Sequence, residues 1–444
     1  MPQTSRAFWG LGAIFFVLSA IWGTGQLTGL VPALPDEDVV ELFSNPPAYS
    51  DSLVSYSLER FASEGDADVG GFMTALPPDE DGQAMAAERA FRSLDQPGAE
   101  RANYPYASQV GLQYLVAREW VRAGLPPKAA VAVFSLLNAL GTGLLVAAIA
   151  IWARTEISAA AGLVTFAAFV ASPMFLERAS SIYWCNALAF APFVFSLYLY
   201  PVMREGWRLL LFLASIAALF FIKSLAGYEF LTNIALGAAV PVVYYEIKAG
   251  GGLSRKAFGR ILLVGTLVVI AAVIGFAGAF GLHAIRAAAL FDGDLAKGLE
   301  AAILPSTYSL TSGDSSIREN LSTSPMNIAE ALIRTYAGRN FVLNVALWGG
   351  FFVGLRLMLR AKAQRGLSWA QMPDKIRFLL LTLPFAVIAC LSWHVFALVH
   401  AVAHSHVIWF TVQLNLLPIM APATVLMWRW ARTGEIVRSA GSLD

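Results

Sequence analysis

The chain has 444 residues, of which 57% are hydrophobic and 14% are charged, and its formal net charge is +1 at pH 7. One aqueous core cannot bury so much apolar surface, so the composition excludes a soluble globular domain and predicts a polytopic membrane protein. A glycine-rich phosphate loop, a G-x-S-x-G turn and a CxxC pair are all missing from suitable contexts, which argues against soluble nucleotide chemistry and against nucleic-acid partners.

Ten apolar stretches have the length that a membrane-spanning helix needs, about 20 residues. The expected fold class is all-α: a polytopic membrane protein with about ten transmembrane helices and a long first outer loop that carries surface helices. The first stretch exceeds the apolar core of a secretory signal and lacks a convincing cleavage site, so it is retained as a span. The stretches are residues 7–30, 129–153, 157–175, 183–203, 208–226, 228–247, 260–284, 341–361, 377–398 and 406–428.

The expected organisation follows from these spans. Residues 1–30 form the first span, 31–125 an outer loop with helices beside the membrane, and 126–284 spans two to seven. Residues 285–340 form a second outer loop, whose proline, glycine, serine and threonine content indicates an irregular segment and a candidate lid. Residues 341–444 hold spans eight to ten and a cytoplasmic tail.

Charge bias gives the orientation, because Lys and Arg near span ends stay on the cytoplasmic side. Residues 31–125 hold 16 acidic residues against 6 Arg and no Lys, whereas the loops on the other side are basic. Both termini are therefore expected to be cytoplasmic, in the inner membrane of a bacterium, with the active site on the periplasmic side.

Within the first outer loop, residues 107–124 have the spacing of an amphipathic helix. Apolar residues such as Val110 and Leu115 alternate there with polar ones such as Gln113 and Arg118. We expect this helix to lie along the membrane surface, before Pro126 turns the chain into the second span.

Three adjacent carboxylates, Asp36, Glu37 and Asp38, follow the first span at the water boundary. Mutual repulsion raises at least one of their pKa values, which suits a general base or a ligand of a divalent metal. The alternative is an exposed helix N-terminus, where acids are favoured by the helix dipole.

Charged and aromatic residues also mark the outer ends of later spans. Arg178 follows span three, and Tyr183 and Trp184 come just after it; the two aromatic residues also suit an interfacial belt. Lys223 and Glu229 flank Tyr228 in a tight turn between two apolar runs. Boundary charges of this kind face a cavity or each other, so a purely structural Lys223–Glu229 pair is the alternative to a site.

The histidines fall on the same predicted face. His283 and Arg286 close span seven, and the remaining four gather between the last two spans. Helical spacing places His400 and His404 on one side, as for a metal ligand pair, but two histidines are incomplete for zinc. Donation to a phosphate oxygen and polar packing are the other two interpretations. These four histidines are His394, His400, His404 and His406.

Only two cysteines occur, Cys185 and Cys390. A disulfide would have to join two helices at similar depth, so we expect two buried thiols that act as small apolar residues.

The order of these features resembles the GT-C superfamily of membrane glycosyltransferases. The resemblance covers the architecture of the whole chain, and at residue level it consists of Pro35-Asp36-Glu37 directly after the first span. It implies a sugar donor carried on polyprenyl phosphate and a lipid, glycan or protein acceptor, both met at the bilayer. It also implies that Asp36 is the base that activates the acceptor hydroxyl, while Glu37 or Asp38 orients the acceptor or a metal. The chain lacks the large soluble carboxy-terminal domain of many oligosaccharyltransferases, which favours transfer of a single sugar.

The chemistry of such a transfer is inverting displacement at the anomeric carbon, and it needs cations or hydrogen-bond donors for the departing phosphate. No cofactor is expected with certainty, and a divalent metal ion is the one candidate. The expected phosphate-binding residues are Arg178, Lys223, Arg286, His400, His404 and His406, and the expected pocket residues are Tyr183, Trp184, Tyr228, Glu229 and His394.

Three other interpretations stay open. An O-antigen polymerase or ligase would use pyrophosphate-linked glycans, but these enzymes tend to place their large loop late in the chain. A transporter would carry charges along its path, whereas here they cluster at one surface and the middle of most spans is apolar. A purely structural scaffold would explain the spans but not the histidines.

Overall fold

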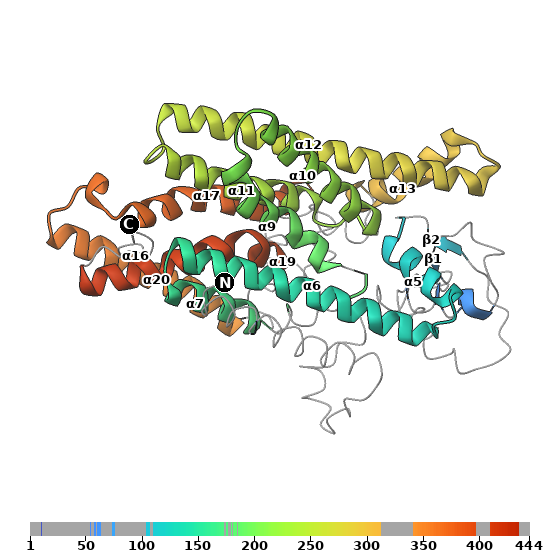
Figure 1. The fold of residues 1–444 in the computed structure, drawn as a ribbon, viewed down its shortest axis with the longest axis horizontal. Coiled ribbons are helices and arrows are strands. Elements are labelled where there is room, and N and C mark those ends of the chain that lie inside the picture. The colour runs from blue at the N-terminus through green and yellow to red at the C-terminus, as the bar shows by residue number, and fades with distance from the viewer. Residues whose placement is uncertain are drawn as a thin grey trace, which may run out of the picture.

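The computed structural model describes residues 10, 54, 57–58, 60–63, 73–75, 104–106, 110–172, 175, 179, 181–183, 185–311, 341–396 and 409–434. This part of the chain is a bundle of helices, which confirms the predicted helical character (Figure 1). A short antiparallel pair, β1 (Met73–Ala75) and β2 (Tyr104–Tyr106), was not predicted. Of the first predicted span, only Gly10 is described, and it is helical.

Five helices are long and apolar enough to cross a membrane. Their length and composition support a membrane protein, but within the described ranges they do not reach the predicted ten spans. At about 1.5 Å per residue, 20 residues cover the roughly 30 Å hydrocarbon layer. The five are α6 (Pro127–Glu156), α9 (Asn186–Met203), α10 (Gly206–Ala226), α12 (Arg255–Ala288) with the short η2 (Ala289–Phe291), and α17 (Asp374–Phe396).

Two segments differ from their predicted form. Helix α7 (Ala159–Val170) has 12 residues and is too short to cross a bilayer alone, so the predicted span at 157–175 is wrong in length. Its start is fixed by the Ser158 side chain, which accepts a hydrogen bond from the Ala161 amide. The loop predicted from residue 285 is helical at first, because α12 runs to Ala288 and α13 covers Leu295–Thr311.

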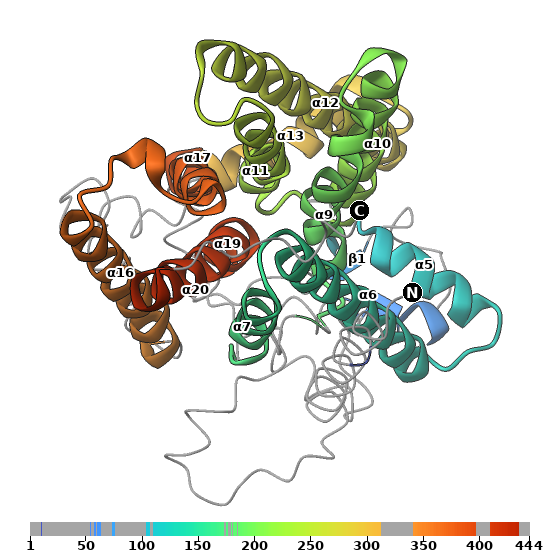
Figure 2. The same ribbon diagram turned by 60° about the vertical axis from the view of Figure 1, so that its left-hand side comes forward.

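The remaining helices complete the bundle. The last predicted span is divided by a π-helix, because the short α19 is followed by the five-residue η5 before α20 begins. In a second view, α7 lies between α6 and α20 (Figure 2). These elements are α5 (Leu112–Arg122), α11 (Leu231–Ala249), α16 (Phe341–Gln364), η3 (Trp369–Gln371), α19 (Trp409–Thr411), η5 (Val412–Leu416) and α20 (Leu417–Thr433).

Small residues let the helices approach closely, as is typical of membrane bundles. Helix α10 packs along α12, and a Cβ atom on Gly275 would lie 2.1 Å from the carbonyl oxygen of Ala217. Any larger residue would push these two helices apart. Within the described residues, the core is otherwise filled by aromatic and aliphatic side chains, such as those of Phe169, Phe190 and Trp152.

The basic termini of many helices lie together, and we call this end of the molecule the basic end. The Lys248 ammonium lies 2.5 Å from a Glu156 carboxylate oxygen, and Arg377 donates to the Gly251 carbonyl. Arg260 donates to the Arg204 carbonyl. These contacts join α6, α9, α11, α12 and α17, as expected for segments that the sequence places on one side.

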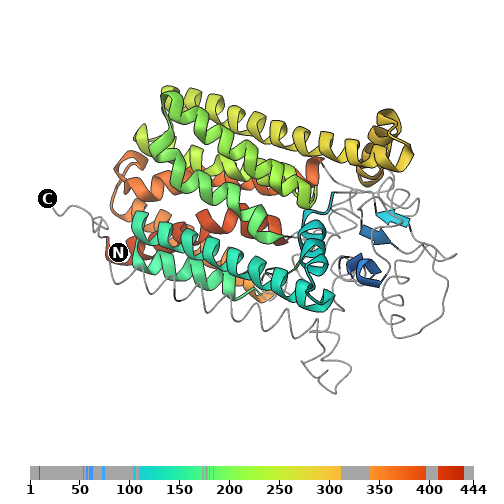
Figure 3. The ribbon, with the colours of Figure 1, turned by 45° about the vertical axis from the view of Figure 1, so that its right-hand side comes forward.

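Helix α5, the β pair and α13 lie at the other end of the bundle, which we call the α5 end (Figure 3). The long helices run lengthwise between the two ends. Helix α5 falls inside the helix predicted for residues 107–124, and it packs on α6 and α10.

Candidate functional site

The buried Lys223 is the centre of a polar cluster at the α5 end. It occupies the last turn of α10, and its side chain is 2% exposed. The Nζ atom donates a 3.0 Å hydrogen bond to the Gly227 carbonyl and lies 3.8 Å from Oε2 of Glu229. A buried ammonium needs such partners because its desolvation costs several kcal/mol. The Lys223–Glu229 pair, which the sequence left open as the alternative to a site, is present with its charged atoms 3.8 Å apart.

Glu229 is held from a second side by Tyr183. The Tyr183 hydroxyl donates to Glu229 Oε1 at 3.1 Å, although the two residues are 46 positions apart. Oε2 is buried and has no hydrogen-bond partner among the described residues, and the Lys223 ammonium lies 3.8 Å from it. Three predicted site residues from three segments therefore meet, and one carboxylate oxygen keeps acceptor capacity.

The neighbouring Tyr228 faces α12. Its hydroxyl is 2.7 Å from Nδ1 of His283, and its ring packs edge-on against Phe276. Burial raises the pKa of Tyr228, and the negative charge of Glu229 raises it further. The phenol therefore keeps its proton at neutral pH and remains a hydrogen-bond donor. His283 is fully buried, so this contact fixes its ring inside the bundle.

Arg286 lies one turn beyond His283 on α12, where it interacts electrostatically with Tyr114 and Arg118 of α5. The Arg118 guanidinium lies over the Tyr114 ring at 5.9 Å. Two cations are thus brought near each other at the edge of the cluster, and the Glu119 carboxylate, 3.3 Å from the Arg118 guanidinium, offsets part of their charge.

Helix α5 covers the cluster with a buried face that includes a residue predicted to face solvent. Gln113, expected on the polar side of a surface helix, is fully buried together with Tyr114 and Ala117. Its Nε2 donates to the Tyr183 carbonyl at 3.3 Å, and its Oε1 has no hydrogen-bond partner among the described residues. In an amphipathic pattern, a glutamine that faces solvent looks the same as one that faces a buried polar site. The prediction for Gln113 was therefore wrong.

Asn138 of α6 positions the chain segment that carries Tyr183. Its Nδ2 donates to the carbonyls of Ala179 and Ser181, at 3.0 and 2.8 Å, and its Oδ1 accepts from the Ala187 amide at 3.2 Å. Asn138 was not among the predicted site residues. The available signal was a lone amide in the middle of an apolar run, which is expensive in a membrane unless it is used.

Backbone strain marks the same region. Three non-glycine residues of the described part have positive φ, and two of them are Cys185 (φ 46°) and Phe230 (φ 60°). They directly follow the segments that carry Tyr183 and Glu229. A bulky residue such as phenylalanine in this conformation is costly, and such strain collects at functional sites when the surrounding packing enforces it.

A second polar group lies next to the cluster, inside the bundle. Asn233 donates to the carbonyls of Ala389 and Cys390, and it accepts from Asn415 Nδ2 at 2.8 Å. Asn415 belongs to the π-helix η5, a form that is frequent at functional sites. Gly237 makes room for it, because a Cβ atom there would lie 2.0 Å from Asn415 Oδ1. These two predicted spans are therefore exceptions to the apolar interior that was expected of most spans.

Aromatic rings separate the two polar groups. Phe230 packs on Trp393 and Phe410, with ring centroids 4.6 and 5.1 Å apart, and Phe410 also meets Phe190. Phe230 follows Glu229 in the chain, so this group of aromatic rings begins directly after the residue that carries the carboxylate.

The structure describes only part of the predicted site. It brings together Tyr183, Lys223, Tyr228 and Glu229, and it places Arg286 near α5. His394 lies in α17, but its side chain is outside the described set. The following predicted residues lie outside the described residues: Asp36, Glu37, Asp38, Arg178, Trp184, His400, His404 and His406.

The predictions for metal and for cysteine have different outcomes. Among the described residues, no group of three His, Cys, Asp or Glu side chains gathers as a metal site, and the carboxylates proposed for that role are not among those residues. Neither Cys185 nor Cys390 forms a disulfide, and both are buried, which confirms the interpretation as packed thiols.

Comparison of the chain with protein-family models, with curated proteins and with solved structures finds no match. The resemblance to membrane glycosyltransferases therefore depends on the sequence features alone.

Proposed function

We propose that the protein is a membrane glycosyltransferase that works at the α5 end of the bundle. In this proposal a sugar moves, with inversion, from a polyprenyl-phosphate donor to an acceptor. The observation that supports it best is the meeting of Tyr183, Lys223 and Glu229, from three segments, within a membrane protein and beneath a covering helix. A structural ion pair would need only Lys223 and Glu229, whereas here Tyr183 and helix α5 are added to it.

The proposed chemistry assigns a role to each group. Negative charge develops on the departing phosphate, and a fixed cation in a water-poor site stabilises it strongly. Lys223 is the buried cation, and Arg286 with Arg118 would receive the remaining phosphate charge. Glu229 and Tyr183 hold the ammonium in position. Asp36 supplies the base that takes the acceptor proton, and a positioned base contributes about 100-fold to 10,000-fold.

The same proposal includes an orientation. The described helix termini with Arg204, Arg260 and Arg377 lie at the basic end, and basic residues are retained in the cytoplasm. The α5 end would then face the periplasm of a bacterial cell, where lipid-linked sugars are used after their transfer across the inner membrane.

The decisive experiment measures sugar transfer in liposomes with purified protein and a defined polyprenyl-phosphate sugar. We expect a covalent product from the wild type and at least about 100-fold less from Lys223→Gln/Glu229→Gln, which removes the charges together and leaves no unpaired partner. Lys297→Gln, an exposed cation on α13 at the same end, is the control and should transfer normally. A wild type that makes no glycosylated product from any such donor would overturn the proposal.

A transporter is the second candidate, and the Asn233–Asn415 pair favours it. Buried amides next to a π-helix in the bundle interior are typical of residues along a substrate path. Uptake of a solute into proteoliposomes without covalent change, reduced by Asn415→Leu, would support transport over sugar transfer.

A further inference from the structure

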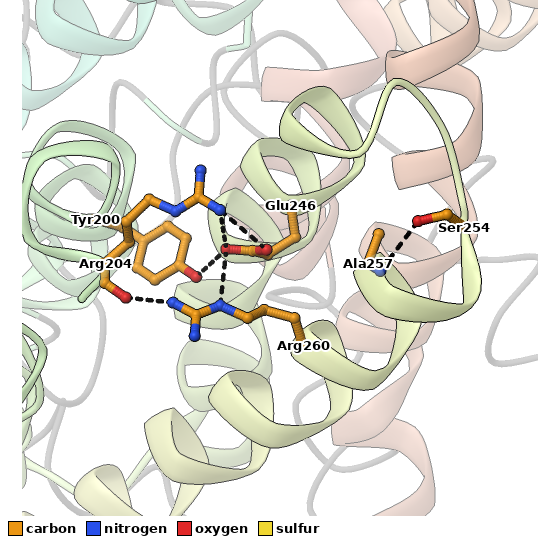
Figure 4. Close-up of polar contacts among 6 residues, drawn as sticks. All are labelled: Tyr200, Arg204, Glu246, Ser254, Ala257 and Arg260. Atoms are coloured by element: carbon orange, nitrogen blue, oxygen red, sulfur yellow. Dashed lines mark hydrogen bonds and ion pairs between the residues drawn. The ribbon is translucent and has the colours of Figure 1, made fainter. Parts of the chain in front are cut away.

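A compact charged cluster lies at the basic end, far from the proposed transfer site. Glu246 of α11 has a side chain that is only 4% exposed, and three residues converge on it (Figure 4). Tyr200 donates to its Oε1 at 2.5 Å, the Arg204 Nη2 atom lies 3.4 Å away, and the Arg260 Nε atom lies 3.6 Å away. Arg260 also donates to the Arg204 carbonyl, which ties the end of α9 to α12.

The cluster has more positive charge than one carboxylate can neutralise. Two guanidinium groups share Glu246, and each guanidinium has five N–H donors. The Nε atom of Arg204 is buried and has no hydrogen-bond partner among the described residues. The two arginine side chains are 31% and 30% exposed, so their remaining donors reach the surface. The site is therefore preorganised for an anion.

The surroundings increase this positive potential. Helix α10 begins two residues after Arg204 with no side-chain cap, so the partial positive charge of its N-terminus lies close to Arg204 along the chain. Arg208 lies in the first turn of α10, and Arg255 and Lys256 precede Arg260 at the start of α12. The exposed Glu205 is the acidic residue of the turn before α10. A helix N-terminus alone would not define a site, but here it adjoins two fixed guanidinium groups.

Exposed apolar side chains flank the arginines on the same elements. Val202 and Trp207 are 63% and 66% exposed, and on α12 Leu262 and Leu263 are also largely exposed. Trp207 at the end of a span is typical of the membrane interface. A free phosphate would leave this surface unused, whereas a phospholipid would contact it with its acyl chains.

We propose that Arg204 and Arg260 bind the phosphate of an anionic phospholipid in the leaflet at the basic end. Its acyl chains lie on the exposed apolar residues of α10 and α12. Glu246 and Tyr200 are positioning residues, because they fix both guanidinium groups before the lipid arrives. The inference is independent of the proposed transfer reaction.

The first test counts bound lipids by native mass spectrometry of the full chain, titrated with phosphatidylglycerol or with phosphatidylcholine of the same acyl chains. We expect the wild type to prefer phosphatidylglycerol, and Arg204→Gln/Glu246→Gln/Arg260→Gln to bind it about tenfold more weakly. This triple variant leaves no buried charge unpaired. Arg360→Gln, an exposed change at the same end, alters the net charge equally and should keep the preference. Equal binding by the wild type and the triple variant would overturn the proposal.

A second measurement needs no variant and decides the matter if the triple variant fails to fold. A photoactivatable phosphatidylglycerol in mixed bilayers should cross-link to the wild type within residues 202–211 or 258–263. Cross-links found only at other parts of the basic end would overturn the proposal. Inorganic phosphate is the remaining arm: if it displaces the lipid at equal concentration, the site binds free anions and the assignment to a lipid is wrong.

Discussion

The Tyr183 hydroxyl donates a 3.1 Å hydrogen bond to Glu229 Oε1, and this contact joins the segment before α9 to the turn before α11. Glu229 in turn faces the ammonium of Lys223 at the end of α10. Three segments are thus connected through one carboxylate, and its position depends on all of them.

Replacing Tyr183 with phenylalanine tests whether this contact serves a site or only stability. Tyr183→Phe should lower the free energy of unfolding by about 1 to 2 kcal/mol, because the bond goes to a charged acceptor. It should also reduce sugar transfer by at least about tenfold, since Glu229 would no longer hold Lys223 in place. The readouts are denaturation in detergent and transfer in liposomes.

Tyr198→Phe is the matched control. In the wild type, the Tyr198 hydroxyl donates a 2.7 Å hydrogen bond to the Ala148 carbonyl at an exposed position, away from the cluster. The Tyr198→Phe change should lower the free energy of unfolding by about 1 kcal/mol or less, because its acceptor is a neutral carbonyl, and it should leave transfer unchanged. Equal transfer rates in the two variants would assign a purely structural role to Tyr183.

Asn138 gives a prediction about positioning. Asn138→Leu removes three hydrogen bonds and leaves the carbonyls of Ala179 and Ser181 without this donor, so we expect a loss of about 3 kcal/mol in the free energy of unfolding. Thr155→Val loses only bonds to its own helix at an exposed position and should change stability by less than about 0.5 kcal/mol. If both variants unfold alike in denaturant, Asn138 does not hold the segment before α9.

A contact between Lys223 and Glu229 could be considered from the sequence, whereas the contact of Tyr183 with Glu229 could not. Charges at the ends of apolar helices face a cavity or each other, so a Lys223–Glu229 pair was one of the two arrangements that the sequence left open. That Tyr183 reaches Glu229 depends on how α9 packs against α11, and no local pattern contains this information. Gln113 was misplaced for the same reason, since its burial depends on where α5 docks.

Errors in the predicted elements have physical causes too. Hydropathy does not mark where a helix ends, so the apolar run at 157–175 was taken as a full span although α7 ends at Val170. Helix α13 was not predicted, because Pro305 and the Ser and Thr residues around it are typical of turns. The π-helix η5 arises from one extra residue per turn and leaves no trace in composition.

The pH dependence of stability should reveal Tyr228. Burial raises the pKa of this phenol above its usual value of about 10, and the negative charge of Glu229 raises it further. Below about pH 10 the group is neutral in both states, so it adds no pH dependence there. Above that pH the unfolded chain releases the proton while the folded chain keeps it. The free energy of unfolding therefore falls as the pH rises from about 10 to the pKa of the folded chain.

Tyr228→Phe removes the group that ionises. Unfolding of the wild type in detergent between pH 9 and pH 11.5 should therefore show an additional loss of stability compared with the variant, with a slope approaching about 1.4 kcal/mol per pH unit. Other buried tyrosines titrate in both proteins and cancel in the difference. Parallel curves would mean that Tyr228 ionises alike in the folded and unfolded chains.

Gly237 tests the contact between α11 and the π-helix. A Cβ atom at this position would lie 2.0 Å from Asn415 Oδ1, so Gly237→Ala must displace the Asn233–Asn415 pair or separate the helices. We expect a loss of about 2 kcal/mol or more, as for overpacking in a dense core. The control is Gly265→Ala in α12, where a Cβ atom meets nothing within 4 Å and where alanine is the better helix former. Thermal unfolding of both variants in detergent would show the difference, and equal midpoints would remove the argument for a close approach.

The orientation can be tested without any assumption about activity. Because Cys185 and Cys390 are buried, a membrane-impermeant maleimide should leave the folded wild type unlabelled. Lys297→Cys on α13 is exposed at the α5 end, and Lys256→Cys on α12 is exposed at the basic end. If basic residues are retained in the cytoplasm, intact bacterial spheroplasts should label only Lys297→Cys, and Lys256→Cys should react after permeabilisation. The reverse pattern would place the Lys223–Glu229 cluster at the cytoplasmic end, where a periplasmic sugar transfer could not use it.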